Sequence, residues 1–105
     1  MCTTTTNAPK AAGTTLSVAV WPTNFASSTE RVDFIKINDV HDFGVCNPGE
    51  DNGNAYFTCL DQRAVDEAWL DASGQQTVTM DVSASVGCCA KDGNYLDAKV
   101  QLCSA

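Results

Sequence analysis

The chain has 105 residues, the length of a single domain, and 44% of them are apolar, which is enough for a hydrophobic core. Thirteen acidic residues against six basic ones give a net charge of −7, which argues against nucleic acid and anionic membrane surfaces as partners. No apolar run approaches the roughly 18–20 residues that a membrane-spanning helix needs, so membrane insertion is not expected.

The chain contains six cysteines. So many in a short chain are typical of an oxidising compartment, and we expect a secreted, extracellular protein rather than a reduced cytosolic one. The N-terminal sequence MCTTTT lacks the basic and apolar regions of a signal peptide. We therefore expect a mature chain whose signal has been removed, the alternative being an excerpt from a longer protein.

Residues 1–13 are expected to form an extended N-terminal arm, and residues 14–105 a single body. The arm consists mostly of Thr, Asn, Pro, Lys, Ala and Gly, and Cys2 is its only side chain suited to burial. A run of threonines in the arm offers sites for O-linked glycan, whereas the sequence contains no Asn-x-Ser/Thr sequon. These threonines are Thr3, Thr4, Thr5 and Thr6.

Two strands are expected next, at residues 14–21 and 31–38. In the first, apolar residues alternate with polar ones and face inward, which leaves Trp21 on the outward side. The inward residues are Leu16, Val18 and Val20. In the second strand the apolar phase shifts part-way, which predicts a β-bulge or burial on both faces.

Residues 40–46 and 55–60 predict two further strands on either side of a turn-rich stretch. Residues 61–72 predict the one short helix of the fold, because their apolar side chains share a helical face and Asp61 can cap the N-terminus. A strand through residues 64–70 is the competing interpretation, which the lack of clean alternation disfavours.

Residues 76–89 and 94–103 predict the last two strands, and the first of them has the cleanest alternation in the chain. Six to seven short strands and one short helix predict an all-β fold. We expect an antiparallel β-sandwich of jelly-roll or Ig-like type.

One disulfide is predicted from strand register. If Asn52 and Gly53 form a type I′ turn, Cys46 lies opposite Cys59 in the resulting hairpin. That pair occupies a non-hydrogen-bonded site, where Cα atoms are about 4.5 Å apart, close enough for a disulfide. The predicted Cys46–Cys59 bond would staple this hairpin.

The other cysteines have no partner nearby in sequence. Alternation over residues 78–87 places Cys88 on the core face of its strand and Cys89 on the outer face. With a three-residue loop before the last strand, Cys103 lies opposite Asp81 and roughly 27 Å from Cys89 along the hairpin. The cysteines without a short-range partner are Cys2, Cys88, Cys89 and Cys103.

Two arrangements of these cysteines stay open. In one, the arm folds back and Cys2 bonds to a cysteine of its own chain. In the other, the arm leaves its own body, adds a strand to the open sheet edge of a neighbouring subunit, and Cys2 bonds there.

No catalytic or cofactor site is expected. His41 is the only histidine in the chain, and a zinc site normally needs several nitrogen or sulfur ligands. We interpret His41 as a solvated side chain beside a turn, and it is also the only base available to activate a nucleophile. Asp66 and Glu67 are adjacent on the expected helix and point apart, so they do not form a glycosidase pair.

The sequence offers two candidate ligand sites, one for calcium and one for a sugar, and each has an alternative explanation in structural terms. Glu50, Asp51 and Asn52 supply hard oxygen ligands for calcium, but turn formation already explains these residues and we expect no metal site. Trp21 faces outward and offers a ring on which a sugar can stack. Other aromatic residues that could take this part are Tyr56, Trp69 and Tyr95.

The plan of an arm that carries Cys2, followed by a β-sandwich with Cys89 or Cys103 on its surface, resembles the subunits of bacterial endospore appendages. In that family, jelly-roll subunits are bonded to their neighbours through cysteines of an N-terminal connector. The resemblance implies a non-enzymatic structural subunit that polymerises with copies of itself through its arm. The alternative is a secreted carbohydrate-binding or adhesion module that uses Trp21.

Overall fold

The computed structural model describes residues 2–3, 7–21, 30–49, 56–83 and 98–104. The expected turn at Asn52 and Gly53 and the expected loop at residues 91–93 lie outside these ranges. Other residues singled out above that lie outside them are Thr4, Thr5, Thr6, Glu50, Asp51, Cys88, Cys89 and Tyr95.

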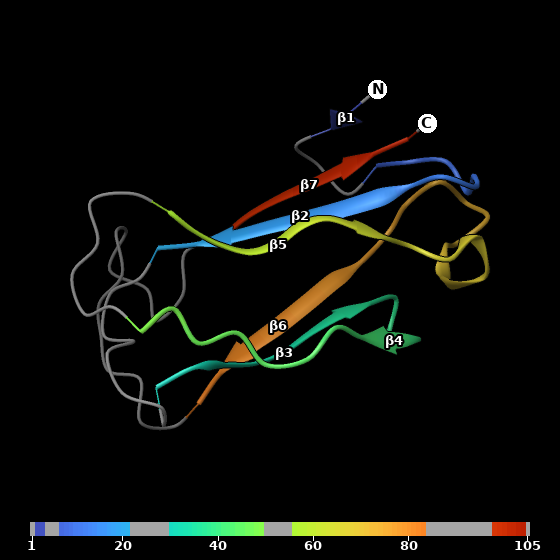
Figure 1. The fold of residues 1–105 in the computed structure, drawn as a ribbon. Helices are drawn as coiled ribbons and strands as arrows, with labels where there is room; N and C mark the ends of the chain where they lie inside the picture. Colours follow the sequence, from blue (N-terminus) through green and yellow to red (C-terminus); the bar gives the residue numbers. More distant parts are fainter. Residues whose placement is uncertain (1, 4–6, 22–29, 50–55, 84–97, 105) are drawn as a thin grey trace.

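The described chain folds into two antiparallel β-sheets, which confirms the expected all-β class. Its strands are β1 (Cys2–Thr3), β2 (Thr15–Val20), β3 (Val32–Ile37), β4 (His41–Asp42), β5 (Phe57–Ala64), β6 (Val78–Val82) and β7 (Ala98–Cys103). One sheet has the strand order β1-β7-β2-β5 and the other β4-β3-β6. The four-stranded sheet is the upper layer in Figure 1, and both chain ends lie beside it.

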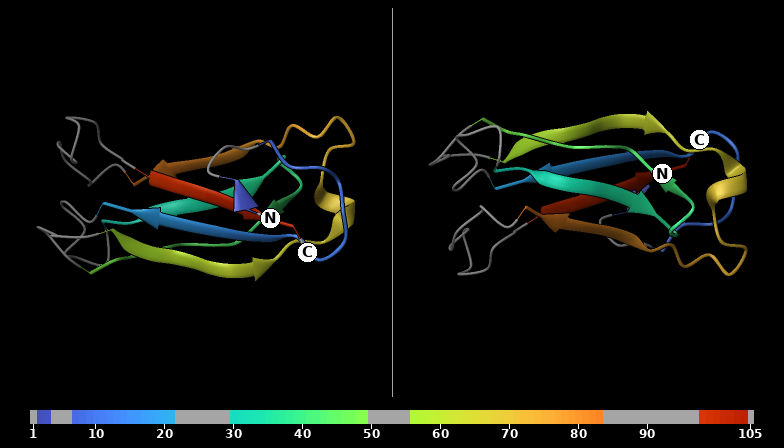
Figure 2. Two further views of the ribbon diagram at one scale, coloured as in Figure 1. Left: turned by 90° about the horizontal axis from the view of Figure 1, so that it is seen from above. Right: turned by 90° about the horizontal axis from the view of Figure 1, so that it is seen from below.

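The core lies between the two layers, which cover one another in both views of Figure 2. On the four-stranded side, the predicted inward residues of β2 are at most 1% exposed, and Leu102 of β7 packs with them. On the three-stranded side, Ile35 and Ile37 of β3 are equally buried. Burying each such aliphatic side chain contributes about 1.5–3 kcal/mol, so these positions hold the layers together.

The shift of apolar phase in β3 has the predicted cause. Val32 pairs with Val82 and Phe34 pairs with Asp81, so β3 advances two residues where β6 advances one. Asp33 is the extra residue, and this β-bulge lets both Val32 and Ile35 reach the core although they differ in parity.

The expected helix at residues 61–72 is wrong. β5 continues through Ala64, and only Glu67–Trp69 form a single 3-10 turn, η1, whose N-cap is Asp66 rather than Asp61. The reason is pairing with β2, because Thr15 and Leu16 lie opposite Ala64 and Arg63. Backbone hydrogen bonds to a neighbouring strand outweigh the weak helical propensity of this segment.

Both expected hairpins are also wrong in their strand pairing. Residues 40–46 form a strand only at His41–Asp42, and Cys46 pairs with Val32 of β3 rather than with β5. β6 pairs with β3 and β7 pairs with β2, so Cys103 does not lie opposite Asp81. Alternation decides which face of a strand is buried, but it does not decide which strand lies beside it.

Candidate functional site

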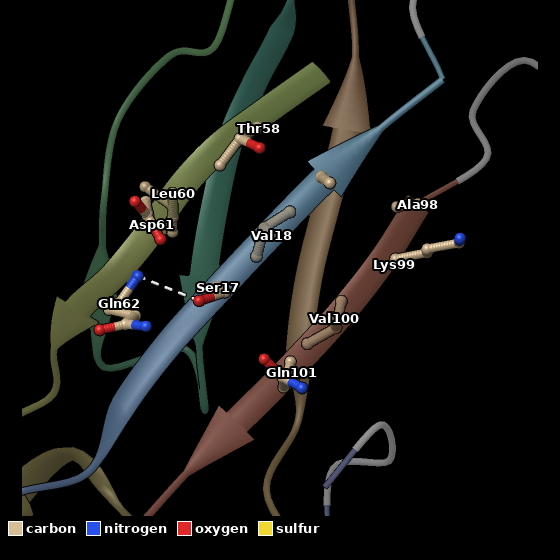
Figure 3. Close-up of a pocket in the computed structure, with 11 residues that line it drawn as sticks. Ser17, Val18, Thr58, Leu60, Asp61, Gln62, Ala98, Lys99, Val100 and Gln101 are labelled. Carbon is tan, nitrogen blue, oxygen red and sulfur yellow. Dashed lines mark hydrogen bonds between the residues drawn. The ribbon is translucent and has the colours of Figure 1, made fainter. Parts of the chain in front are cut away.

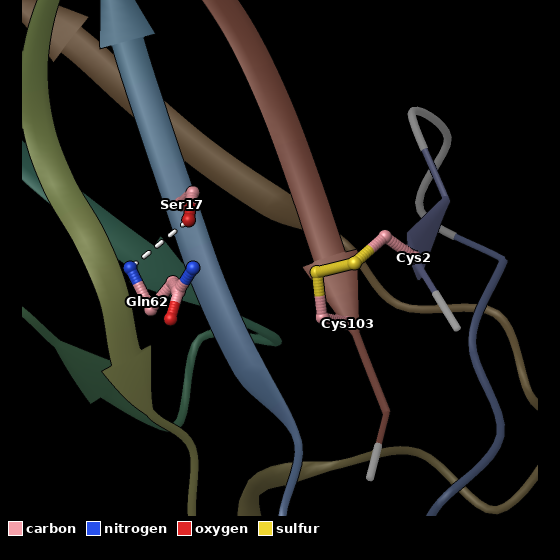
Figure 4. Close-up of a disulfide and its surroundings, with 4 residues drawn as sticks. All are labelled: Cys2, Ser17, Gln62 and Cys103. Atoms are coloured by element: carbon pink, nitrogen blue, oxygen red, sulfur yellow. Dashed lines mark hydrogen bonds between the residues drawn. A yellow bond between two sulfur atoms is a disulfide. The ribbon is translucent and has the colours of Figure 1, made fainter.

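The N-terminal arm is bonded to its own chain. Strand β1 pairs with β7 in a register that places Cys2 opposite Cys103, and the two form a disulfide (Figure 4). Of the two arrangements left open by the sequence, the structure has the one within the chain. The bond joins residues 101 positions apart, so in the loop-entropy description it stabilises the fold by about 4–5 kcal/mol.

The arm makes a second attachment further along, which the sequence did not indicate. Asn7 forms a bridge with Gln75, and the backbone N–H of Ala8 donates to the carbonyl of Gly74 at 2.9 Å. Ala8 is 5% exposed and belongs to the core, whereas Cys2, the arm residue expected to be buried, is exposed. A small apolar side chain therefore anchors the arm.

Gln76 is the centre of this second attachment and is 1% exposed. Its Nε2 donates to the carbonyls of Ala8 at 2.8 Å and Asp71 at 3.1 Å. Its Oε1 accepts from Nδ2 of Asn38 and from the backbone N–H of Asp71, both at 2.7 Å. All the donor and acceptor sites of the buried amide are thus used, as burial of a polar group requires.

Asn38 extends the network to two other segments. Its Nδ2 also donates to the carbonyl of Trp69 at 2.8 Å, and its Oδ1 accepts from the backbone N–H of Thr77. Asn38 has a φ of 51°, a conformation that Asn adopts more readily than most residues. The arm, the turn after β3 and the segment that follows η1 are therefore held by one set of amide groups.

The junction between arm and body lies at Gly13, which has a φ of 81°. This left-handed conformation favours glycine, because a Cβ would be strained there. Immediately after it, Thr14 is 1% exposed, and its carbonyl accepts a hydrogen bond from the backbone N–H of Val65 at 2.9 Å. The body is thus fixed from Thr14 onward.

The second disulfide joins Cys46 to Cys59, the pair that the sequence predicted. Its structural role differs from the predicted one. Cys46 exchanges backbone hydrogen bonds with Val32 of the three-stranded sheet, whereas Cys59 belongs to β5 of the four-stranded sheet. The bond therefore ties the two layers together instead of stapling a hairpin.

Trp21 and Tyr56 lie together at one end of the four-stranded sheet. Their ring centroids are 5.3 Å apart in an edge-to-face arrangement, and Nζ of Lys99 lies 4.2 Å from the centroid of the Tyr56 ring. Trp21 follows β2, Tyr56 precedes β5 and Lys99 is on β7, so three neighbouring strands supply this aromatic cluster.

A groove runs along the outer face of the same sheet (Figure 3). It has a volume of about 650 Å³ and is lined by residues of β2, β5 and β7. Among the lining residues, Ser17 accepts a hydrogen bond at Oγ from the backbone N–H of Gln62 at 3.0 Å. Gln62 has a φ of 47° and lies where β5 bulges against β2.

His41, for which the sequence predicted a solvated side chain, is half-buried and packs among aromatic rings. Its ring stacks on Trp69 with centroids 3.9 Å apart, and the ring of Phe43 packs edge-on against it at 4.8 Å. Within the described residues, no group of three or more His, Cys, Asp or Glu side chains could hold a metal ion. Asp66 and Glu67 serve η1, where the Asp66 carboxylate accepts from the backbone N–H of Ala68.

The carboxyl of Asp71 has a displaced pKa. Hydrogen bonds from the backbone N–H and side chain of Ser73 lower its pKa below the usual value of 3.8. Asp71 is exposed and belongs to the turn before Gly74, so this displacement reflects turn structure rather than a reactive group.

Among the described residues, no helix is long and apolar enough to cross a membrane. Comparisons of the chain with protein-family models, with curated proteins and with solved structures gave no match.

Proposed function

We propose that the protein is a non-enzymatic structural subunit of an extracellular fibre or appendage, which assembles by exchanging its N-terminal arm between neighbouring copies. Its two sheets would form a β-sandwich of the jelly-roll or Ig-like type expected from the sequence. The subunits of bacterial endospore appendages, which the plan of the chain resembles, supply the analogy. The observation that carries the proposal is the pairing of the N-terminal strand β1 with β7, locked by Cys2 and Cys103.

The contacts between the arm and the body can form within one chain or between two copies of the chain. The arm contacts the body through the Cys2–Cys103 bond, the bridge of Asn7 with Gln75 and the burial of Ala8. Each of these contacts forms equally well when the arm comes from a second copy, which is the basis of domain swapping. Exchange therefore costs little beyond the lost freedom of the joined subunits.

The arm is long enough for this exchange. Gly13 lies between arm and body and is the natural hinge, because glycine tolerates a large change in φ and ψ. Residues 1–12 span roughly 40 Å when fully extended. The longest dimension of the molecule is 37 Å, so an arm released at Gly13 reaches the β7 edge of an adjacent copy.

The geometry of exchange favours a chain of subunits over a closed pair. Each subunit gives its arm to one neighbour and receives an arm from another, which is a head-to-tail contact that extends without limit unless it closes into a ring. The exchange conserves the number of disulfides when a small-molecule thiol starts it. The thiolate of that molecule attacks Sγ of Cys103 and releases Cys2 as a thiolate, and a Cys2 thiolate from a neighbouring chain then attacks the mixed disulfide at Cys103 and releases the small thiolate. Two disulfides are also consistent with an extracellular protein.

A mixture of two variants tests the exchange directly. Cys2→Ser keeps the acceptor thiol of Cys103, and Cys103→Ser keeps the donor thiol of Cys2. Neither variant can form the bond within its own chain, so a Cys2–Cys103 bond in the mixture must join two chains. The mixture is incubated with oxidised glutathione, which accepts the two electrons released when the two thiols form their bond. We expect non-reducing electrophoresis to show a covalent pair at twice the 11.1 kDa of the monomer, with the Cys2–Cys103 peptide identified by mass spectrometry.

The wild-type protein and an arm deletion complete the test. Wild-type protein at high concentration should give a non-reducing ladder that collapses to the monomer on reduction, and removal of residues 1–13 should abolish it. Absence of the Cys2–Cys103 peptide from the mixture, together with a wild-type protein that stays monomeric in light scattering, would overturn the proposal.

A further inference from the structure

We propose that the groove on the outer face of the four-stranded sheet binds a short, neutral oligosaccharide, with the aromatic cluster of Trp21, Tyr56 and Lys99 at one end of it. This is a binding site separate from the arm, and it does not depend on assembly.

The groove owes its shape to side-chain size. β2 is the strand between β5 and β7, and its outward side chains at the groove are the small ones of Ser17 and Ala19. In the strand register, Lys99 lies beside Ala19, and Gln101 lies beside Ser17. The longer side chains of Gln62 on β5 and of Lys99 and Gln101 on β7 thus flank the small side chains of β2. Figure 3 shows β2 between the two strands that carry them.

The size of the groove suits a small ligand. A volume of about 650 Å³ falls within the range typical of small-molecule sites. From Ser17 to Trp21 the strand advances about 13 Å, at the rise per residue of an antiparallel strand. A short oligosaccharide has a matching length.

The polar lining offers the groups that sugar hydroxyls need. Hydroxyls both donate and accept hydrogen bonds, and the amides of Gln62 and Gln101 do the same in fixed directions. These side chains are exposed, as is the carboxylate of Asp61, which accepts only. The backbone on this side is held in place by the hydrogen bond between Ser17 Oγ and the N–H of Gln62.

The aromatic cluster supplies an apolar surface next to these polar groups. Trp21 lies two residues beyond Ala19, and Tyr56 lies two residues before Thr58, so both rings lie at the same end of the groove. Rings of this kind combine a broad apolar face with a polar edge, which suits the apolar face and polar rim of a sugar ring. Lys99 lies over Tyr56 and restrains its position.

Charge selects a neutral ligand. The lining residues include one cation, Lys99, and one carboxylate, Asp61, so the groove itself carries no net charge. The whole chain has a net charge of −7, which repels anionic polysaccharides. Neutral sugars are not subject to this electrostatic repulsion.

The test uses a panel of defined probes with the full chain. Neutral hexasaccharides of glucose, xylose, mannose and N-acetylglucosamine are compared with oligogalacturonate and a heparin fragment, and binding is followed by chemical-shift changes of backbone amides. We expect saturable binding of at least one neutral probe, with the largest shifts at Ser17, Ala19 and Lys99. Binding of only the anionic probes, or of none, would overturn the proposal.

Three variants locate the site. Ala19→Ile fills the floor of the groove with a strand-compatible side chain, and Trp21→Ala removes the stacking surface. Each should weaken binding at least about tenfold. Thr79→Ile places the same side chain on an exposed position of β6 in the other sheet and should leave binding unchanged. Circular dichroism confirms folding, and full affinity in a folded Ala19→Ile protein would refute the assignment of the groove.

Discussion

Cys46 and Cys59 belong to different sheets, and the disulfide between them is a covalent link across the core. Cys46 is 8% exposed and its backbone pairs with Val32, while Cys59 is the extra residue of a bulge in β5, between Thr58 and Leu60. The bulge breaks the alternation of β5 at Cys59. A residue there can turn toward the opposite layer without displacing Leu60 from the core.

Removing this link should lower stability without unfolding the protein. For the double variant Cys46→Ala/Cys59→Ala, the loop-entropy description predicts a loss of about 3 kcal/mol in the free energy of unfolding. Urea denaturation followed by circular dichroism measures it. The double change avoids leaving a lone thiol, and an unchanged urea midpoint would show that packing alone holds the layers together.

Gln76 should be more important to the arm than its neighbour Gln75. Gln76→Leu leaves the carbonyl of Ala8 and the backbone N–H of Asp71 without their amide partner in a buried site. We expect a loss of about 2–4 kcal/mol in the free energy of unfolding. Proteolysis within residues 1–13 should become faster, because the arm is released before the body unfolds.

Gln75→Leu is the matched control for this change. Gln75 is exposed and meets the arm through its backbone, so its side chain can be replaced with little effect. If both variants lose the same stability, the amide network around Gln76 does not hold the arm.

The strands of the core were predictable because burial alternates in them. β2 and β7 present an apolar residue to the core at every second position, and this period is visible in the sequence alone. The bulge in β3 was predictable for the same reason, since a break in the period must be absorbed by an extra residue.

Contacts between distant segments were not predictable from the same patterns. Cys46–Cys59 was the right pair, but the hairpin used to derive it does not exist, because β5 and Cys46 lie in different layers. Gln76 and Asn38 look like surface residues in the sequence. Only the fold shows that Gln76 is buried and bonded to the half-buried Asn38, and no local signal distinguishes the two from other amides.

Gln62 occupies a backbone conformation that suits glycine. Its φ of 47° lies in the left-handed region, where a residue with a Cβ is strained. Gln62→Gly should raise the free energy of unfolding by up to about 1 kcal/mol, and Gln62→Val should lower it, because β-branching worsens the strain. The N–H donated to Ser17 belongs to the backbone and is retained in both variants.

A glycine substitution at Gln101, on the neighbouring strand β7, is the control for that experiment. Gln101 has no positive φ, so Gln101→Gly should lower the free energy of unfolding by roughly 0.5–1 kcal/mol. Opposite signs for the two glycine variants in urea denaturation confirm the backbone strain at Gln62, and equal signs would contradict it.

Acid should loosen the attachment of the arm through Asp71. Hydrogen bonds from Ser73 lower the pKa of this carboxyl below 3.8, so the folded state favours the charged form. A depressed pKa contributes stability that is present above the ordinary value and is lost as the pH falls through the folded value. Protonation therefore weakens the turn that presents the carbonyl of Gly74 to the N–H of Ala8.

Amide exchange at Ala8 measures this effect. Its protection factor, corrected for the intrinsic rate, should fall as the solution is taken from about pH 5 to about pH 2. Ser73→Ala keeps the backbone N–H but removes the hydroxyl, so the fall should begin at a higher pH. In Asp71→Asn the group cannot titrate, and a protection factor at Ala8 that still falls over this range would assign the acid effect to another carboxyl.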